Sequence, residues 1–294
     1  MINNLELDLA EDVEFKDIYI GFKSENFRVK LGNIKIPFSL DTYSSSKYAS
    51  FMEDSLTDTF VENRKFGGEL KISQKSGKSR ANIFLGIFQN SIDENRDDDD
   101  EVQRAILKTT YGYKLGKKHI LHLGASYLYS NFDGNSRRYK QDSVFEDIEN
   151  RLINLKIVNI DSTHDFGLET LYINRSFHFQ AEFFNSAVND YMFSGFYAQM
   201  GYFLFGGSKK FKLKDAKFSK PKAKNDLEIA FRYSNLNLTE LEDVDKTQEE
   251  YNFALNWYIN KNLKLLTNYN ITYPNNYKYD GMYQSLQTRM LILF

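Results

Sequence analysis

Residues 284–294 read QSLQTRMLILF, and their side chains alternate between apolar and polar along the chain. In an extended chain, one face would carry Leu286, Thr288, Met290, Ile292 and Phe294, and the other Ser285, Gln287 and Arg289. A period of two residues is the pattern of a β-strand. An edge strand of a soluble sandwich fits this segment alone, but an apolar face opposite a polar one also fits a strand between lipid and an aqueous lumen.

The same alternation recurs along the whole chain, which favours the membrane strand. We predict strands at residues 3–9, 14–22, 27–36, 66–74, 79–88, 104–115, 119–130, 164–173, 176–185, 195–205, 226–235, 249–260, 263–273 and 284–294. A segment of about ten residues, at roughly 3.3 Å per residue and a tilt near 45°, spans a hydrocarbon layer of about 25 Å. The sequence therefore predicts an all-β fold, an antiparallel transmembrane β-barrel of the bacterial outer membrane with about 14 strands visible.

Composition agrees with a barrel and excludes other classes. Aromatic residues make up 16% of the chain, as 25 Phe, 20 Tyr and one Trp, which suits the aromatic girdles of a barrel. A mean hydropathy of −0.54 excludes a helical membrane protein. A net charge of −2 gives no reason to expect nucleic acid. Residues 1–294 read as one barrel domain, and because no secretory signal precedes the first strand, we expect Met1 to be an internal or truncated start.

Strand direction assigns the connections to the two sides of the membrane. If the last strand ends in the periplasm, the short turns 116–118 and 260–262 lie there too. The turn 174–176 joins them only if residues 131–163 contain no membrane strand, so we interpret residues 151–160 as part of a long outer loop. Long connections are then predicted at 37–65 and 131–163 outside and at 206–225 inside. In porins such loops can narrow the pore.

The inner connection is rich in lysine. It carries Lys209, Lys210, Lys212, Lys214, Lys217, Lys220, Lys222 and Lys224. Two interpretations stay open: a solvated charge run, or an electropositive patch that raises the anion concentration at the pore exit.

Several motifs resemble those of the phosphate-selective porin O and P family. The first is LGNIKIPFSL at residues 31–40, followed by SSKY at 45–48, FME at 51–53 and Arg64. Later matches are FGLE at 166–169, QAEF at 180–183, GFYAQMGYFL at 195–204, EIAFRYS at 228–234 and LNWY at 255–258. Each is weak alone, but their order and spacing are specific.

This resemblance implies a sixteen-stranded, homotrimeric outer-membrane channel for small inorganic anions such as phosphate or polyphosphate. The chain would then lack a signal peptide and about two N-terminal strands. Its surroundings would be outer-membrane lipid and lipopolysaccharide, and no cofactor, metal or nucleic acid is implied. The anion would bind where inward-folded loops form a constriction. The resemblance places Lys35, Ser45, Ser46, Lys47, Arg64, Arg137 and Arg138 at this constriction. It also implies that the inner lysines act as a periplasmic anion sink.

Physical chemistry supports these residue types. An anion that loses hydration in a narrow pore needs charge-assisted hydrogen bonds, which Arg, Lys and Ser provide. A structural salt bridge is an equally valid role for each basic residue. Wall carboxylates at Glu6, Asp8, Glu169, Glu182 and Glu228 are expected to balance wall arginines such as Arg232 and Arg289. Asp54 stands where the family motif has Arg, which weakens the case for phosphate.

Other functions have less support. Residues 93–101, DENRDDDDE, lack EF-hand spacing and read as a solvated outer loop rather than a Ca²⁺ site. The four histidines have no metal-ligand spacing, and no nucleotide-binding or hydrolase motif is present, so no enzyme is predicted. A phospholipase-type barrel would need Ser and His on the outer wall, whereas His122 and Ser126 face the lumen. The alternatives to an anion channel are a general or differently selective porin and a plugged barrel with an adhesin or structural role.

Overall fold

The computed structural model describes residues 1–8, 14–90, 102–116, 118–141, 152–239, 246–275 and 281–292. Fourteen strands pair antiparallel, each with its neighbour in sequence, except that β10 pairs with β13. The strands of this sheet are β1 (Ile2–Asp8), β2 (Glu14–Lys23), β3 (Phe27–Lys35), β4 (Arg64–Ser76), β5 (Ser79–Phe88), β6 (Gln103–Gly116), β7 (His119–Gln141), β8 (Ile153–Asn174), β9 (Phe177–Val188), β10 (Tyr191–Phe203), β13 (Asp226–Asn237), β14 (Thr247–Tyr258), β15 (Leu263–Asn275) and β16 (Tyr283–Ile292). All fourteen predicted strands are present, within a few residues at their ends except in β7 and β8.

Side-chain burial follows the two-residue period of the sequence. On β13, Glu228 and Arg232 are buried on the concave face of the sheet, whereas Ile229 is 51% exposed on the convex face. The convex face also exposes Leu168, Phe183 and Trp257. Polar side chains are therefore inside and apolar ones outside, which is the arrangement of a barrel in lipid. The predicted fold class is confirmed.

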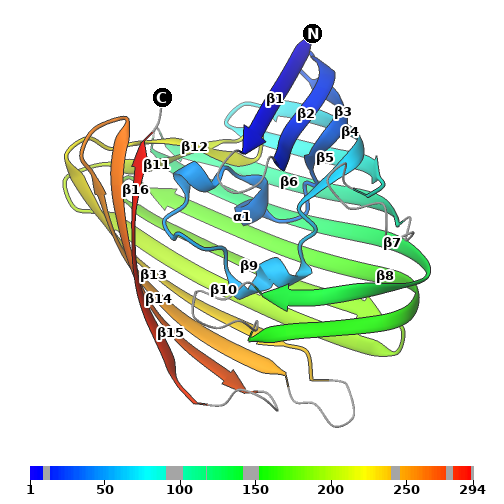
Figure 1. Cartoon of the computed structure of the whole chain (residues 1–294). Helices are drawn as coiled ribbons and strands as arrows, with labels where there is room; N and C mark the ends of the chain where they lie inside the picture. Colours follow the sequence, from blue (N-terminus) through cyan, green and yellow to red (C-terminus); the bar gives the residue numbers. More distant parts are fainter. Residues whose placement is uncertain are drawn as a thin grey trace.

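One long connection fills part of the concave side. Residues 36–63, here called the inward segment, contain α1 (Leu40–Tyr43) and the short 3₁₀ helices η1 (Ser46–Tyr48) and η2 (Leu56–Phe60). Figure 1 shows α1 inside the curve of the sheet. The segment packs there through hydrogen bonds to β9, β13 and β16. The expectation that this connection folds into the lumen is confirmed.

The prediction of an outer loop at residues 131–163 is wrong for most of the residues described there. β7 continues to Gln141 and β8 begins at Ile153, so the two strands form one hairpin that is much longer than a membrane span. Its register shifts between Asn131 and Arg137. Asp133, Gly134 and Asn159 have positive φ angles of 50°, 85° and 54° there, which bends the hairpin. Figure 1 shows its far part returning over the concave side.

The inner connection 206–225 also differs from a plain loop. It contains a two-stranded hairpin of β11 (Ser208–Lys212) and β12 (Lys217–Lys222), separate from the large sheet. The turn of this hairpin reaches the opposite wall, where Lys71 Nζ donates to Lys214 O at 2.7 Å and Asn82 Nδ2 donates to Leu213 O at 2.9 Å. The hairpin therefore crosses the lumen, and its lysines lie on a folded element.

The sheet has two ends. β1 and β16 are its terminal strands and, within the described ranges, do not pair with each other. Because the sheet has fourteen antiparallel strands, Met1 and the end of β16 lie at the same rim, here called the terminal rim (Figure 1). Residues 93–101, interpreted above as a solvated loop, are outside the described residues. No helix of the described chain is long and apolar enough to cross a membrane.

Candidate functional site

Wall side chains hold the inward segment by its backbone carbonyls. Four contacts come from cations on β3, β13, β15 and β16. They are Lys35 Nζ to Thr42 O at 2.6 Å, Arg232 Nη1 to Glu53 O at 3.1 Å, Lys264 Nζ to Ala49 O at 2.7 Å and Arg289 Nη1 to Met52 O at 3.3 Å. A cationic donor forms a stronger bond to a carbonyl than a neutral donor does. These charges therefore stabilise the segment.

A first cavity, the distal cavity, lies at the rim opposite the terminal rim. It has a volume of about 700 Å³ and is bounded by the end of the inward segment and the bent β7–β8 hairpin. Its basic side chains are Lys65, Arg104, Arg137, Arg138, Lys140 and Lys156, and its acid is Glu62. Glu62 is already paired with Arg104 and, at 3.7 Å, with Lys65. The net charge of the lining is strongly positive.

Electrostatics keep Glu62 charged in this cavity. Burial raises the pKa of a carboxyl, but Arg104 and Lys65 outweigh that effect and hold the pKa of Glu62 below its ordinary value. No side chain in the described parts of the molecule forms an ion pair with Arg138, Lys140 or Lys156. These three cations are the ones able to meet an anion that enters the cavity.

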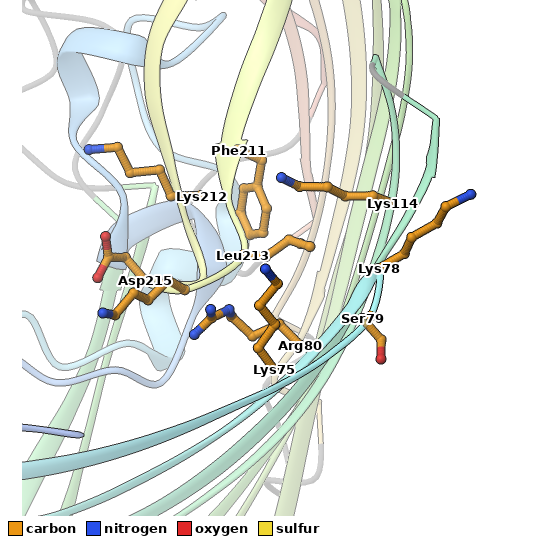
Figure 2. Close-up of a pocket in the computed structure, with 11 residues that line it drawn as sticks. Lys75, Lys78, Ser79, Arg80, Lys114, Phe211, Lys212, Leu213 and Asp215 are labelled. Atoms are coloured by element: carbon orange, nitrogen blue, oxygen red, sulfur yellow. The ribbon is translucent and has the colours of Figure 1, made fainter. Parts of the chain in front are cut away.

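A second cavity, the terminal cavity, lies at the terminal rim between the wall and the turn of the β11–β12 hairpin. Its volume is about 660 Å³, and its basic residues are Lys75, Lys78, Arg80, Lys114, Lys212 and Lys214. Figure 2 shows Lys114 extending from the wall toward Phe211 of the hairpin, whereas Lys78 points away. The cavity therefore presents cations from both the wall and the hairpin.

The acid of the terminal cavity is neutralised. Asp215 lies 3.2 Å from Lys71 Nζ and 3.6 Å from Arg28 Nη1. Burial opposes ionisation of Asp215, yet Lys71 outweighs it and lowers the pKa of that carboxyl. Among the described residues, Lys75, Lys114 and Lys212 have no ion-pair partner, so they can attract an anion.

The structure separates the residues proposed for one constriction. Lys35 also donates to Ser44 O at 3.3 Å and thus holds the segment. Ser45 is half-buried, and Ser46 and Lys47 are exposed on the same segment. Arg64 Nε forms an ion pair with Asp17 at 2.7 Å. None of these five lines either cavity described above.

Arg137 and Arg138 are neighbours in the chain but have different surroundings. Arg137 is buried and donates to Asp165 Oδ2 at 2.6 Å and to Phe60 O at 3.2 Å, so it joins the bent hairpin to the inward segment. Arg138 is exposed in the distal cavity. Of the seven residues predicted for the constriction, these two line the distal cavity, and within the described residues only Arg138 has its charge unpaired.

The eight inner lysines have four different surroundings. Lys212 and Lys214 line the terminal cavity. A further cavity of about 490 Å³ at the base of the hairpin is lined by Lys210, Lys220, Lys222 and Lys224. Lys209 is buried 3.5 Å from Glu228, and Lys217 Nζ lies over the ring of Tyr43. Burial and the charge of Arg28 lower the pKa of Lys217. The run is therefore only partly solvated.

Sequence reasoning missed most of the cavity cations. Lys65, Arg104, Lys140 and Lys156 in the distal cavity, and Lys75, Lys78, Arg80 and Lys114 in the terminal cavity, were not singled out. Six of them lie in or beside the ends of predicted strands, where a search for basic residues would have found them: Lys65, Lys75, Lys78, Arg80, Arg104 and Lys114. Lys140 and Lys156 lie in the parts of β7 and β8 that were predicted as a loop, so this signal would have missed them.

The expected balance between wall acids and wall arginines is wrong for Glu169 and Glu228. Glu169 pairs with Lys108 and His122, at 2.5 and 2.7 Å, and Glu228 pairs with His178 at 2.8 Å. Arg232 instead donates to carbonyls of the inward segment, including Asp54 O at 3.2 Å. The Asp54 side chain is exposed. Glu6 and Asp8 lie outside the residues whose side chains are described.

The model of phosphate-selective porin O and P matches residues 3–287, nearly the whole chain. The chain belongs to the phosphate-selective porin O and P family. A 26% identical relative is an uncharacterized protein of Caulobacter vibrioides, and a 23% identical one is Porin O of Pseudomonas aeruginosa. The matches cover 91% and 85% of this chain but only 58% and 66% of the relatives.

Solved structures show the same fold in outer-membrane proteins. OmpT of Vibrio cholerae matches with a TM-score of 0.56 at 10% identity, over 97% of this chain and 80% of that one. OprB of Pseudomonas putida matches with a TM-score of 0.57 at 12% identity, over 96% and 74%. Together with the family, they place this porin in the bacterial outer membrane. Family membership supports a porin channel rather than an enzyme.

Proposed function

We propose that the chain forms an outer-membrane channel for passive diffusion of small anions, with phosphate and polyphosphate as the substrate class. The observation that carries this proposal is a cationic cavity at each end of the lumen, whose acids are already paired. Charges of one sign in a low-dielectric cleft raise the local concentration of the opposite ion. Arg138 and the lysines that have no ion-pair partner among the described residues would make only weak, multiple contacts, which allow an anion both to enter and to leave.

Reversal potentials in planar bilayers test the proposal. In a KCl gradient the porin should be anion-selective, and replacing Arg138, Lys140 and Lys156 by Gln should lower the anion-to-cation permeability ratio. The matched control replaces Lys140 and Lys156 by Arg and keeps Arg138, so that the charge of the cavity is unchanged. Cation selectivity of the parent protein would reject the anion channel, and equal permeability ratios in parent and Gln variant would reject the role of the distal cavity.

A plugged barrel is the second candidate, and one observation favours it. The inward segment and the β11–β12 hairpin meet inside the sheet, where Lys209 Nζ donates to Tyr48 O at 2.7 Å and Phe218 N donates to Ser44 Oγ at 3.2 Å. Two elements that brace each other could close the lumen. A single-channel conductance indistinguishable from a protein-free bilayer would support the plug.

We further propose a homotrimer in outer-membrane lipid and lipopolysaccharide. An OmpT trimer form of Vibrio cholerae matches this fold with a TM-score of 0.51 and 11% identity, which supports the fold only. Chemical cross-linking in detergent, followed by denaturing electrophoresis, should give a band at three chain masses. A monomer at all cross-linker concentrations would contradict it.

A further inference from the structure

Two carboxylates on the wall contact the inward segment at separate points. Glu182, on β9, is 2% exposed and accepts hydrogen bonds from Ser39 Oγ at 3.1 Å, Leu40 N at 2.7 Å and Asp41 N at 3.0 Å. These donors belong to the start of α1. Tyr197 OH, from the adjacent strand, donates to the same carboxylate at 2.6 Å. All four of these contacts of Glu182 are with donors, and three of the donors come from the segment.

Glu228, on β13, contacts the segment eleven residues further along. It is fully buried and accepts from Ser50 Oγ at 2.6 Å. His178 Nε2 lies 2.8 Å from the same oxygen, and Tyr258 OH donates to the other at 2.7 Å. Asn256 Nδ2 bridges this carboxylate, at 3.1 Å, and Ser50 O, at 2.8 Å. The wall therefore binds both the side chain and the carbonyl of Ser50.

A buried carboxylate requires several donors, and here the inward segment provides part of each set. If the segment moved, Glu182 would lose three donors at once. An amide could not replace that carboxylate, because its NH₂ group would face backbone N–H donors. The position of the segment and the hydrogen bonding of the two carboxyl groups therefore depend on each other.

We propose that Glu182 and Glu228 are positioning residues, which fix the inward segment against the wall and thereby set the width of the anion path. The claim that these residues set the width of the anion path rests on the proposed channel function. The claim that they fix the inward segment does not, and a separate measurement tests it.

Thiol labelling measures the position directly, because the chain contains no cysteine. Thr42 is buried beside the Glu182 contact, and its Oγ1 has no hydrogen-bond partner among the described residues, so Thr42→Cys loses no bond. In this background, Glu182→Gln should speed reaction with a charged maleimide at least about tenfold, the factor for loss of one charge-assisted hydrogen bond. Glu228→Gln should act in the same direction.

Two controls isolate the effect. Glu250 is another buried wall carboxylate, but it accepts its hydrogen bond from Asn252, on its own strand. Glu250→Gln should leave the labelling of Cys at position 42 unchanged. Ser130 is buried on β7, also without a partner in the described chain, so Ser130→Cys reports general loosening of the wall and should not respond to Glu182→Gln.

The outcomes separate the two parts of the proposal. Unchanged labelling in both Gln variants, or equal acceleration at positions 42 and 130, overturns the positioning role. Faster labelling at position 42 with unchanged single-channel conductance keeps that role and rejects the control of pore width. If a Gln variant does not fold, Ser39→Ala and Ser50→Ala remove the same contacts from the side of the segment, and they should accelerate labelling as well.

Discussion

Replacing Arg137 by Met should destabilise the folded barrel by about 3–5 kcal/mol, the cost of leaving one member of a buried ion pair alone. Arg137 is 6% exposed, and Asp165 is fully buried. The guanidinium also donates to Thr163 Oγ1 at 3.0 Å and packs on the ring of Tyr139 at 4.7 Å. Met retains most of the packing, so the loss comes from the hydrogen bonds and from the Asp165 charge.

A double-mutant cycle isolates the pair. Asp165→Asn in the Arg137→Met background removes the uncompensated charge and should restore part of the stability, with a coupling of about 2–3 kcal/mol. The measurement is equilibrium urea unfolding in lipid vesicles, followed by the fluorescence of Trp257, the single tryptophan, which is partly exposed on the convex face.

The opposite result would assign Arg137 to the anion path. A loss below about 1 kcal/mol is typical of a solvated ion pair. If that small loss came with a large fall in anion permeability, Arg137 would be a ligand for the anion, and the structural role argued from its contacts would be wrong. The exposed neighbour Arg138 provides the contrast, since Arg138→Met should change permeability and leave stability within about 0.5 kcal/mol.

Three further predictions concern the inward segment and the hairpin. Burial and the charge of Asp54 raise the pKa of Asp41 from 3.8 to about 6. The folded state therefore holds a proton that the unfolded state releases, and the free energy of unfolding should fall as the pH rises from 3.8 to about 6. Asp41→Asn should abolish that fall, measured by urea unfolding at several pH values. Thr42→Val replaces a buried hydroxyl without a partner in the described residues and should stabilise the barrel by about 1 kcal/mol, whereas equal or lower stability would show that a partner exists. Gly112→Val places a side chain where a Cβ would lie 2.3 Å from Cδ2 of Leu213, so the Leu213 side chain must leave its place against the wall. The hairpin turn should then be held less firmly and proteolysis of residues 213–216 should increase, a change that Ser79→Ala at the same rim should not cause.

The strands could be predicted from the sequence because alternation depends only on which side of each strand faces lipid. In β13, for example, Ile229 and Glu228 differ in polarity because one contacts hydrocarbon and the other the lumen. The far parts of β7 and β8 were missed for a different reason. Buried Ile153 and Leu155 alternate with exposed residues, as in a strand, and they pack with Tyr139 in the bent hairpin. Residues 151–160 were interpreted as a loop because strand parity excluded one more membrane strand. The assignment of connections to the two sides by strand direction is unaffected, because a hairpin that extends beyond the membrane and returns adds no membrane crossing.

The hairpin of β11 and β12 was missed for a related reason. Its two faces contact different parts of the protein, so Phe211 packs near His122 while Lys212 is exposed. A run with eight lysines reads as a solvated turn when only its charge is counted. Its contacts with β4 and β5 lie far away in the sequence, as Lys71 with Asp215 shows. Contacts between elements on opposite sides of the lumen leave no pattern in the local sequence.

Residue type alone could not distinguish cations that bind the protein from cations that meet an anion. Carbonyl oxygens of the inward segment and oxygens of phosphate are both acceptors, and Lys35, Arg137 and Arg232 would suit either. Carbonyl oxygens of the segment lie within hydrogen-bond distance of these three side chains. An arriving anion must compete with those carbonyls, whereas Arg138 and Lys114 have no ion-pair partner within the ranges that the structure describes. The charges that act on anions are therefore expected at the two mouths, and the charges along the middle of the lumen set its shape.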